Sequence, residues 1–212
     1  RRQRQMFIRD STPPYSLWDG KDYKSTALSE QERYNWIEFH KWMLKGQWFT
    51  PLTRNGNLVL MARAEMGYLG HYNKNKVSPF ERFEVGGDGM TGYNMYGIDI
   101  ISMRGYDDGA LDPVGSNYSC AYNKYTMELR YPLLLKGQTN IYVLGFLEGG
   151  NGFTSWKEFS PFKIKRSAGI GVRLFLPVVG MVGVDWGWGF DPAAGQTKRS
   201  GSHIHFTMGM QF

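Results

Sequence analysis

The last ten residues of the chain alternate strictly between two kinds of residue. From His203 to Phe212, every even position is apolar and every odd position is polar or glycine. Side chains of a β-strand point alternately to its two faces, so this period of two predicts a strand with one apolar face. Four more stretches alternate in the same way, namely residues 58–68, 124–133, 167–176 and 182–190.

Other stretches predict strands whose facing the pattern does not define, namely residues 3–13, 34–49, 80–87 and 140–150. The expected number of strands is therefore about nine. Helical periodicity is nearly absent. The tetrapeptide Ser29-Glu30-Gln31-Glu32 is typical of a capping box and predicts one short helix near residues 30–35.

Two β architectures share this alternation, because a soluble sandwich packs its apolar face inward and a membrane barrel turns that face to lipid. Strands of about ten residues, longer than the roughly five or six of most soluble strands, favour the barrel. So does a second face rich in glycine and charge. Aromatic residues also gather near the strand ends, as at membrane interfaces: Trp36, Trp48, Tyr68, Tyr131, Trp188, Phe190 and Phe212. We therefore predict an all-β protein, a transmembrane antiparallel β-barrel.

Composition and charge exclude several other classes. The formal net charge of +6 could indicate a nucleic-acid partner, but the basic residues are dispersed except at residues 1–4 and 163–166, so we expect none. The single cysteine, Cys120, cannot form an internal disulfide. No segment approaches the roughly 18 to 20 apolar residues of a membrane helix.

The predicted connections differ in length. Residues 135–140 and 177–180 are short links, whereas 88–122, 151–165 and 191–202 are long. Outer-membrane barrels have short periplasmic turns and long outer loops, which predicts that the C-terminus lies on the periplasmic side. Two links fit this scheme poorly: residues 50–56 are short on the outer side, and residues 14–33 are long on the inner side.

An odd count of about nine strands is unusual for a bacterial barrel, and an open barrel leaves edges that lipid cannot satisfy. We therefore expect residues 1–212 to be the C-terminal portion of a larger barrel, whose first strands lie outside this chain.

The segment Ile100–Pro113 carries the tripeptide Arg104-Gly105-Tyr106. Here the chain resembles the outer-membrane protein assembly family, in its BamA branch, whose hallmark is an Arg-Gly-Phe/Tyr tripeptide in a long outer loop that folds back into the barrel. Three further stretches agree in order and spacing: Glu81–Gly87, Lys165–Arg173 with Pro177 after it, and the C-terminal Phe212. The first 80 residues match less well, and Thr12–Ser16 with its long insertion is similar to Bacteroidetes variants.

This resemblance implies a barrel of sixteen strands, preceded by periplasmic domains that lie outside this chain. It also implies that loop 88–122 folds inward and that Arg104 reaches acidic residues on the barrel wall. The matching positions are Glu128 and Glu148, and the alternation independently puts Glu128 on the polar face. A guanidinium between carboxylates makes strong, directional bonds that would restrain a long loop. The plainer alternatives are a solvated Arg104 and a rim carboxylate at Glu148, whose strand also carries Phe146 on the same face.

Three other residues on predicted polar faces, Arg173, Asp185 and Gly209, also have expected roles. Arg173 and Asp185 lie on adjacent predicted strands and are expected to form a lumen ion pair. The resemblance implies that Gly209 lets the final strand kink inward, so that the lateral seam beside Phe212 is weakly paired. The alternative is that Gly209 is one of many glycines that give room in the lumen.

The resemblance implies an outer-membrane insertase, which folds and inserts β-barrel proteins by templating strands at a lateral seam. Such a protein is not an enzyme and needs no cofactor. The expected partners are unfolded outer-membrane clients, accessory lipoproteins and outer-membrane lipid, and the expected location is the bacterial outer membrane. The alternatives are a related barrel that secretes a partner protein through its lumen, and a passive channel.

An outer-membrane lipase is a further alternative, but the sequence has no Gly-x-Ser-x-Gly elbow. His203 and His205 share one face of the last strand. They lack an evident further ligand, so we expect no metal site.

Overall fold

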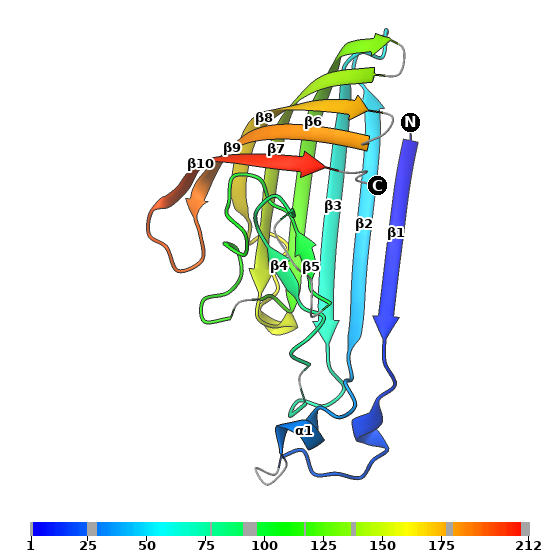
Figure 1. Cartoon of the computed structure of the whole chain (residues 1–212), viewed down its shortest axis with the longest axis vertical. Helices are drawn as coiled ribbons and strands as arrows, with labels where there is room; N and C mark the ends of the chain where they lie inside the picture. Colours follow the sequence, from blue (N-terminus) through cyan, green and yellow to red (C-terminus); the bar gives the residue numbers. More distant parts are fainter. Residues whose placement is uncertain are drawn as a thin grey trace.

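The computed structural model describes residues 2–24, 29–76, 78–90, 97–116, 118–136, 139–176 and 180–208. One antiparallel sheet of eight strands dominates it, in the order β1-β2-β3-β6-β7-β8-β9-β10. These strands are β1 (Arg2–Ser11), β2 (His40–Pro51), β3 (Val59–Gly70), β6 (Ala121–Lys136), β7 (Thr139–Phe153), β8 (Lys165–Leu176), β9 (Gly180–Pro192) and β10 (Arg199–Met208). The sheet coils so strongly that β8, β9 and β10 cross the direction of β1, β2 and β3 (Figure 1).

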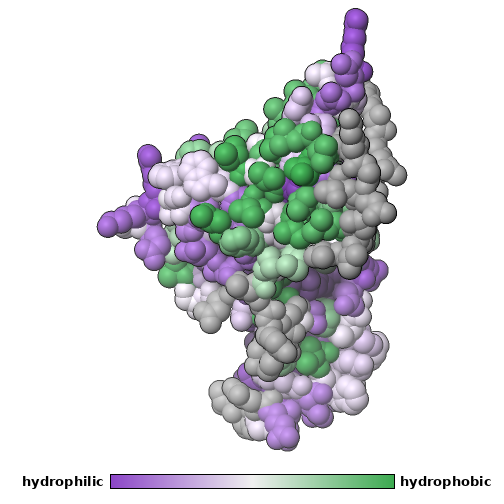
Figure 2. All heavy atoms as spheres, turned by 45° about the horizontal axis from the view of Figure 1, so that its top comes forward, coloured by the Kyte–Doolittle hydropathy of each residue, from purple (hydrophilic) through white to green (hydrophobic). Residues whose placement is uncertain are grey.

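The sequence predicted all eight of these strands, five of them from the period of two, although the strand expected at residues 34–49 begins only at His40. Their facing distinguishes the two architectures. Val184, Trp186 and Met208 are 44%, 46% and 61% exposed, whereas Asp185 between the first two is completely buried. A sandwich would bury the apolar positions and expose the polar ones. Figure 2 shows a broad area of apolar side chains on the surface. The sheet is therefore apolar outside and polar inside, as in a membrane barrel, although it is not closed over the described residues.

The stretch 80–87 is the exception, because it does not form a strand of the wall. Within it only β4 (Phe83–Val85) is a strand, and it pairs in parallel with β5 (Asp99–Ile101) in a separate sheet. Phe83 and Val85 are buried because they pack on the concave side of the wall, where the Phe83 ring meets Tyr122 edge-on at 4.8 Å. The wall thus has eight described strands and not nine.

Removal of this strand from the wall puts the three longest links, β1–β2, β3–β6 and β7–β8, at the same end of the sheet. The β9–β10 link also lies at this end, which we call the long-link end (Figure 1). The links β2–β3, β6–β7 and β8–β9 lie at the opposite, short-turn end. The predicted membrane sides of residues 14–33 and 50–56 were therefore wrong. The prediction counted residues 80–87 as a wall strand, and one extra strand moves every earlier link to the opposite side.

The helical content is small and local. The helix α1 (Glu30–Arg33) begins as predicted, since the Ser29 N–H donates to Glu32 Oε2 at 3.2 Å and the Glu32 N–H donates to Ser29 Oγ at 3.3 Å. Two 3-10 turns, η1 (Tyr15–Leu17) and η2 (Trp156–Glu158), lie in long links. Among the described residues, no helix has the length and apolar character needed to cross a bilayer.

The buried apolar core lies between the wall and the long β3–β6 link. Side chains from β2, β3 and β6 pack there against side chains of β4, β5 and the residues that follow β5. The cluster comprises Phe39, Met43, Leu69, Phe83, Val85, Ile101, Met103, Tyr106, Leu111 and Tyr122. The link thus lies on the concave side of the sheet, toward its long-link end (Figure 1).

If the outer face contacts lipid, a charge in its middle should be costly. Ile170 lies near the centre of β8 and is 63% exposed. Ile170→Arg should destabilise the protein by about 2–4 kcal/mol in lipid vesicles, the range for an arginine at the bilayer midplane. The matched change is Phe162→Arg, in the β7–β8 link, where the side chain is 90% exposed.

Urea unfolding in vesicles, followed by the electrophoretic mobility of the folded protein, would measure both variants. The Phe162 variant should unfold close to the wild type. Equal tolerance of arginine at the two positions would contradict the lipid-facing assignment.

Candidate functional site

The tripeptide Arg104–Tyr106 follows β5 and is held in place by the backbone of the same link. The Met103 N–H donates to the Gly87 carbonyl at 2.9 Å, and the Gly87 N–H donates to the Tyr106 carbonyl at 3.2 Å. Gly87 has a φ of +67°, a conformation that favours glycine. This frame directs the tripeptide toward the wall.

The Arg104 guanidinium lies between carboxylates from the wall. Its Nη2 donates to Glu128 Oε1 at 2.6 Å and to Glu148 Oε1 at 2.7 Å. The Arg104 backbone N–H donates to Glu148 Oε2 at 2.9 Å, and Nη1 lies 3.6 Å from Asp185 Oδ2. One side chain from the loop therefore contacts β6, β7 and β9.

Phe146 gives this guanidinium a flat apolar platform. Its ring centroid lies 3.7 Å from Arg104 Cζ, a cation–π contact. The aromatic residue that makes the lumen face of β7 look unusual in the sequence is thus the stacking partner of Arg104. Arg104 and Glu148 are 7% and 5% exposed, so neither the solvated arginine nor the rim carboxylate describes this site.

Burial and the neighbouring carboxylates act on the pKa of Arg104 in opposite directions. Burial disfavours its charged form, but the carboxylates of Glu148 and Glu128 outweigh this effect and hold the pKa of Arg104 above its ordinary value. The guanidinium is therefore a permanent cation. A buried ion that loses its partner is strongly destabilising, so the loop and the wall depend on each other.

Each of these wall carboxylates also faces a cation from the wall itself. The pairs are Arg130–Glu128 at 2.6 Å, Lys124–Glu148 at 3.8 Å and Arg173–Asp185 at 2.5 Å. The Arg173 fork makes two bonds to Asp185, as a bidentate pair does. The wall charges are thus nearly balanced before the loop adds Arg104.

Gly105 rests directly on the backbone of β9. It has a φ of +87°. A Cβ atom on Gly187 would lie 2.7 Å from Gly105 N, and one on Gly189 would lie 2.4 Å from Gly105 O. The tripeptide therefore needs glycine on the wall as well as in the loop. The sequence did not predict this role, although two lumen-face glycines that alternate with outward aromatic residues were a usable signal.

Tyr106 and two histidines make the remaining contacts between the loop and the wall. The Tyr106 hydroxyl donates to the Arg166 carbonyl of β8 at 2.8 Å, and burial raises its pKa to about 12, so it is a neutral donor. The Gly105 N–H donates to His205 Nε2 of β10 at 2.8 Å. His203 Nδ1 lies 3.1 Å from Asp107 Oδ1. In the sequence these histidines suggested metal ligands at most, whereas in the structure both contact the loop.

The predicted seam residues Gly209 and Phe212 lie outside the described residues. Their roles stay predictions.

Asp112 joins two distant parts of the β3–β6 link. The Val85 N–H donates to its two carboxylate oxygens at 3.2 and 3.3 Å, and Ser119 Oγ donates to Oδ1 at 2.5 Å. Burial raises the pKa of the Asp112 carboxyl to about 7, and the neighbouring Glu84 carboxylate acts in the same direction. Deprotonation above this pH would leave a buried charge in the link.

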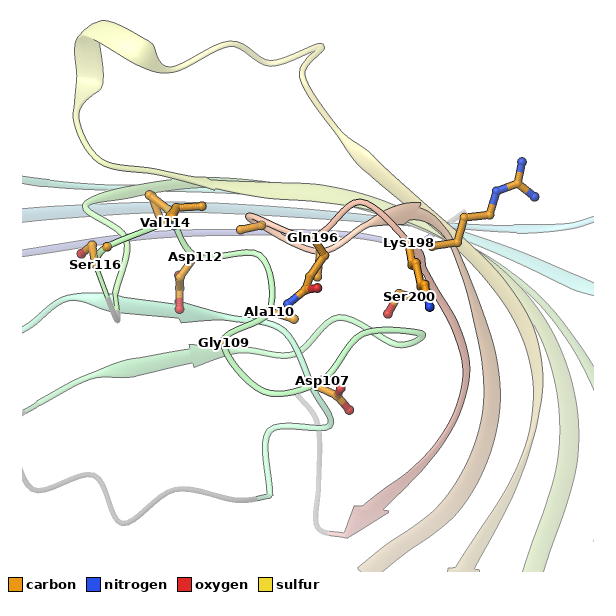
Figure 3. A pocket seen from close by; sticks show the side chains of 14 residues that line it. Asp107, Gly109, Ala110, Asp112, Val114, Ser116, Gln196, Lys198 and Ser200 are labelled. Carbon is orange, nitrogen blue, oxygen red and sulfur yellow. The ribbon is translucent and has the colours of Figure 1, made fainter.

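Two cavities show what the site can accommodate. The cavity that Arg104 lines measures 20 Å³, which is room for about one water molecule. A larger cavity of 540 Å³ lies at the long-link end, between the loop residues Asp107–Ser116 and the β9–β10 link with Gln196 and Lys198 (Figure 3). Arg104 does not line it. The tripeptide site is therefore a clamp rather than a substrate pocket.

Comparisons with known proteins agree with this geometry. A model of the Omp85 superfamily domain matches residues 27–212. No curated protein matches the sequence. Among solved structures, the crystal structure of BamA from Haemophilus ducreyi lacking POTRA domains 1-3 is similar, with a TM-score of 0.55 and 17% sequence identity. The match covers 79% of this chain and 34% of that one, and it shows a shared fold.

A side chain at Gly187 should displace the tripeptide. Gly187→Val puts a Cβ 2.7 Å from Gly105 N, closer than the two atoms can pack, so the loop should become accessible to protease in the folded protein. The control is Gly46→Val in β2, where a Cβ meets nothing within 4 Å. Limited proteolysis of both variants in detergent, with cleavage sites mapped by mass spectrometry, would check this. Unchanged protection of the loop in the Gly187 variant would contradict the packing of Gly105 against β9.

The attachment of the link should weaken as pH rises. The folded pKa of Asp112, about 7, exceeds its unfolded value near 3.8, so its contribution is fully present below about pH 4 and is lost as pH rises through 7. Amide exchange at Val85 and its neighbours, corrected for intrinsic rates, should show less protection at pH 8 than at pH 5. Asp112→Asn cannot titrate and should flatten this difference. An unchanged pH dependence in the variant would refute the assignment.

Proposed function

The chain belongs to the Omp85 superfamily, and from this premise we propose that it forms the wall and the inward loop of an outer-membrane protein insertase. We further propose that residues 1–212 are the C-terminal portion of the barrel domain, with the loop between residues 88 and 122. The observation that carries the proposal is the clamp of Arg104 across β6, β7 and β9 on a sheet with an exposed apolar face.

In the proposed mechanism, an incoming strand of an unfolded client adds to the edge of β10. Lipid cannot hydrogen-bond to backbone N–H and C=O groups, so an unpaired strand is costly there. A templating edge lowers that cost for each strand in turn. Among the described strands β10 pairs with β9 alone, which leaves its other edge for this role. Gly209 and Phe212 would shape the seam beyond it.

The clamp would keep the loop on the lumen side while the seam opens. Glu128 and Glu148 hold the guanidinium of Arg104, and Tyr106 holds the next wall strand through the Arg166 carbonyl. The site makes and breaks no covalent bond, so the proposal includes neither an enzymatic activity nor a cofactor.

The proposed location is the bacterial outer membrane, with the long-link end outward and the C-terminus periplasmic, since outer loops are long and periplasmic turns are short. The proposed partners are unfolded β-barrel clients, accessory lipoproteins and the surrounding lipid.

Two other functions remain as alternatives. A passive channel needs an open lumen, whereas the apolar core here occupies the concave side of the sheet. A related barrel that secretes a partner protein would share the loop and the clamp. The number of periplasmic repeats in the full-length protein separates that alternative from an insertase.

Arg104→Ala should lower the amount of folded β-barrel clients in the outer membrane severalfold, because it leaves Glu128 and Glu148 buried without their loop cation. Arg104→Lys should restore little, since an ammonium lacks the flat group that stacks on Phe146 and the second nitrogen that lies 3.6 Å from Asp185. Arg54→Ala, in the exposed β2–β3 link, is the matched control.

Quantitative mass spectrometry of outer-membrane fractions, at equal abundance of each variant, would measure this effect. Normal client levels with Arg104→Ala at wild-type abundance would overturn the proposed role of the clamp.

A further inference from the structure

We propose that His205 is a positioning residue that ties the Arg104–Tyr106 tripeptide to the terminal strand β10, so that the seated loop restrains this strand against displacement. The inference rests on the proposed function, because it makes the loop part of the control of the seam.

The geometry of His205 is that of a buried acceptor. Its Nε2 accepts the Gly105 N–H at 2.8 Å, and the side chain is 5% exposed. Since Nε2 accepts, the ring proton of the neutral imidazole must lie on Nδ1. Without this acceptor, a buried backbone N–H at the centre of the tripeptide would lose its partner, which is costly.

His203, two residues earlier on the same face, is a weaker second contact. Its Nδ1 lies 3.1 Å from Asp107 Oδ1, but the Asp107 side chain is 82% exposed, so solvent screens the pair. The two imidazole rings stack at 6.1 Å between centroids. His205 is therefore the contact on which the attachment of β10 depends.

The position of β10 in the sheet gives this contact its significance. The tripeptide also contacts β6, β7, β8 and β9, and each of those strands has a neighbour on both sides. Among the described strands, β10 has only β9 beside it. At the rim the Ala194 N–H of the β9–β10 link donates to the Ala110 carbonyl, which holds the hairpin end but not the strand that follows.

The consequence is a thermodynamic coupling between loop and seam. Displacement of β10 away from the lumen must break the Gly105–His205 bond, and release of the tripeptide removes the same bond. Each event therefore makes the other easier, as linkage requires. Through Gly105 the coupling reaches Arg104 and its carboxylates, because the three residues of the tripeptide are consecutive.

The test compares His205→Leu, which removes the acceptor, with His205→Gln, whose amide oxygen can still accept. In the full-length protein with Cys120→Ser, spin labels at Val114 and Met208 report the separation of the loop from β10. Labels at Val114 and Ile170 report the separation of the loop from β8. All three label sites are well exposed.

His205→Leu should raise the population of displaced Val114–Met208 distances by about 5- to 30-fold, the factor expected for one lost buried bond. The Val114–Ile170 distances should stay unchanged. His205→Gln should return the first distribution toward wild type, and His203→Leu should have a smaller effect than His205→Leu. If the leucine variant does not fold, His205→Ala removes the acceptor without adding bulk.

Wild-type distances in the leucine or alanine variant would overturn the inference, and so would equal broadening of both label pairs, which indicates general loosening of the loop. Client levels measured on the same variants test the proposed function separately. Displaced β10 distances with normal client assembly in the same variant would support the role of His205 and count against the insertase proposal.

Discussion

A single buried cation organises the inner side of this molecule. The Arg104 guanidinium lies in the lumen of the sheet, where it is stable only because carboxylates from the wall neutralise it. Its partners come from strands separated along the chain, so satisfying this one charge requires the wall to curve around the loop. The loop in turn cannot leave without removing from Glu128 and Glu148 the cation that bonds to both of them, which leaves each with its wall cation alone.

The outer face of the sheet carries apolar side chains in place of charged ones. A soluble protein buries its apolar residues, whereas this sheet turns Val184, Trp186 and Met208 outward and keeps Asp185 and Arg173 inside. That inversion is stable only if the exterior solvent is itself apolar, and a bilayer meets this condition. The lumen is consequently where polar chemistry can be concentrated, and glycines such as Gly187 let a loop approach the wall there.

The sequence predicted the wall well and the contacts between loop and wall poorly, for one physical reason. Period-two alternation is local, so it identified five of the eight described wall strands and put Glu128 on the polar face. It failed at residues 80–87, because a short strand buried beneath the wall carries the same apolar residues as a strand within it. The acceptor at His205 is 100 residues from Gly105, and no local pattern encodes such a distance.

The arrangement also explains how a rigid clamp can coexist with a movable seam. The bonds of Arg104 are strong and go to β6, β7 and β9, which are held on both sides and have little freedom. The bond to β10 is a single neutral hydrogen bond from a backbone N–H to an imidazole. Neutral bonds are about half as strong as charge-assisted ones. Strain at the edge of the sheet would therefore break this contact first, and the loop would stay seated on the remaining strands while the terminal strand moves.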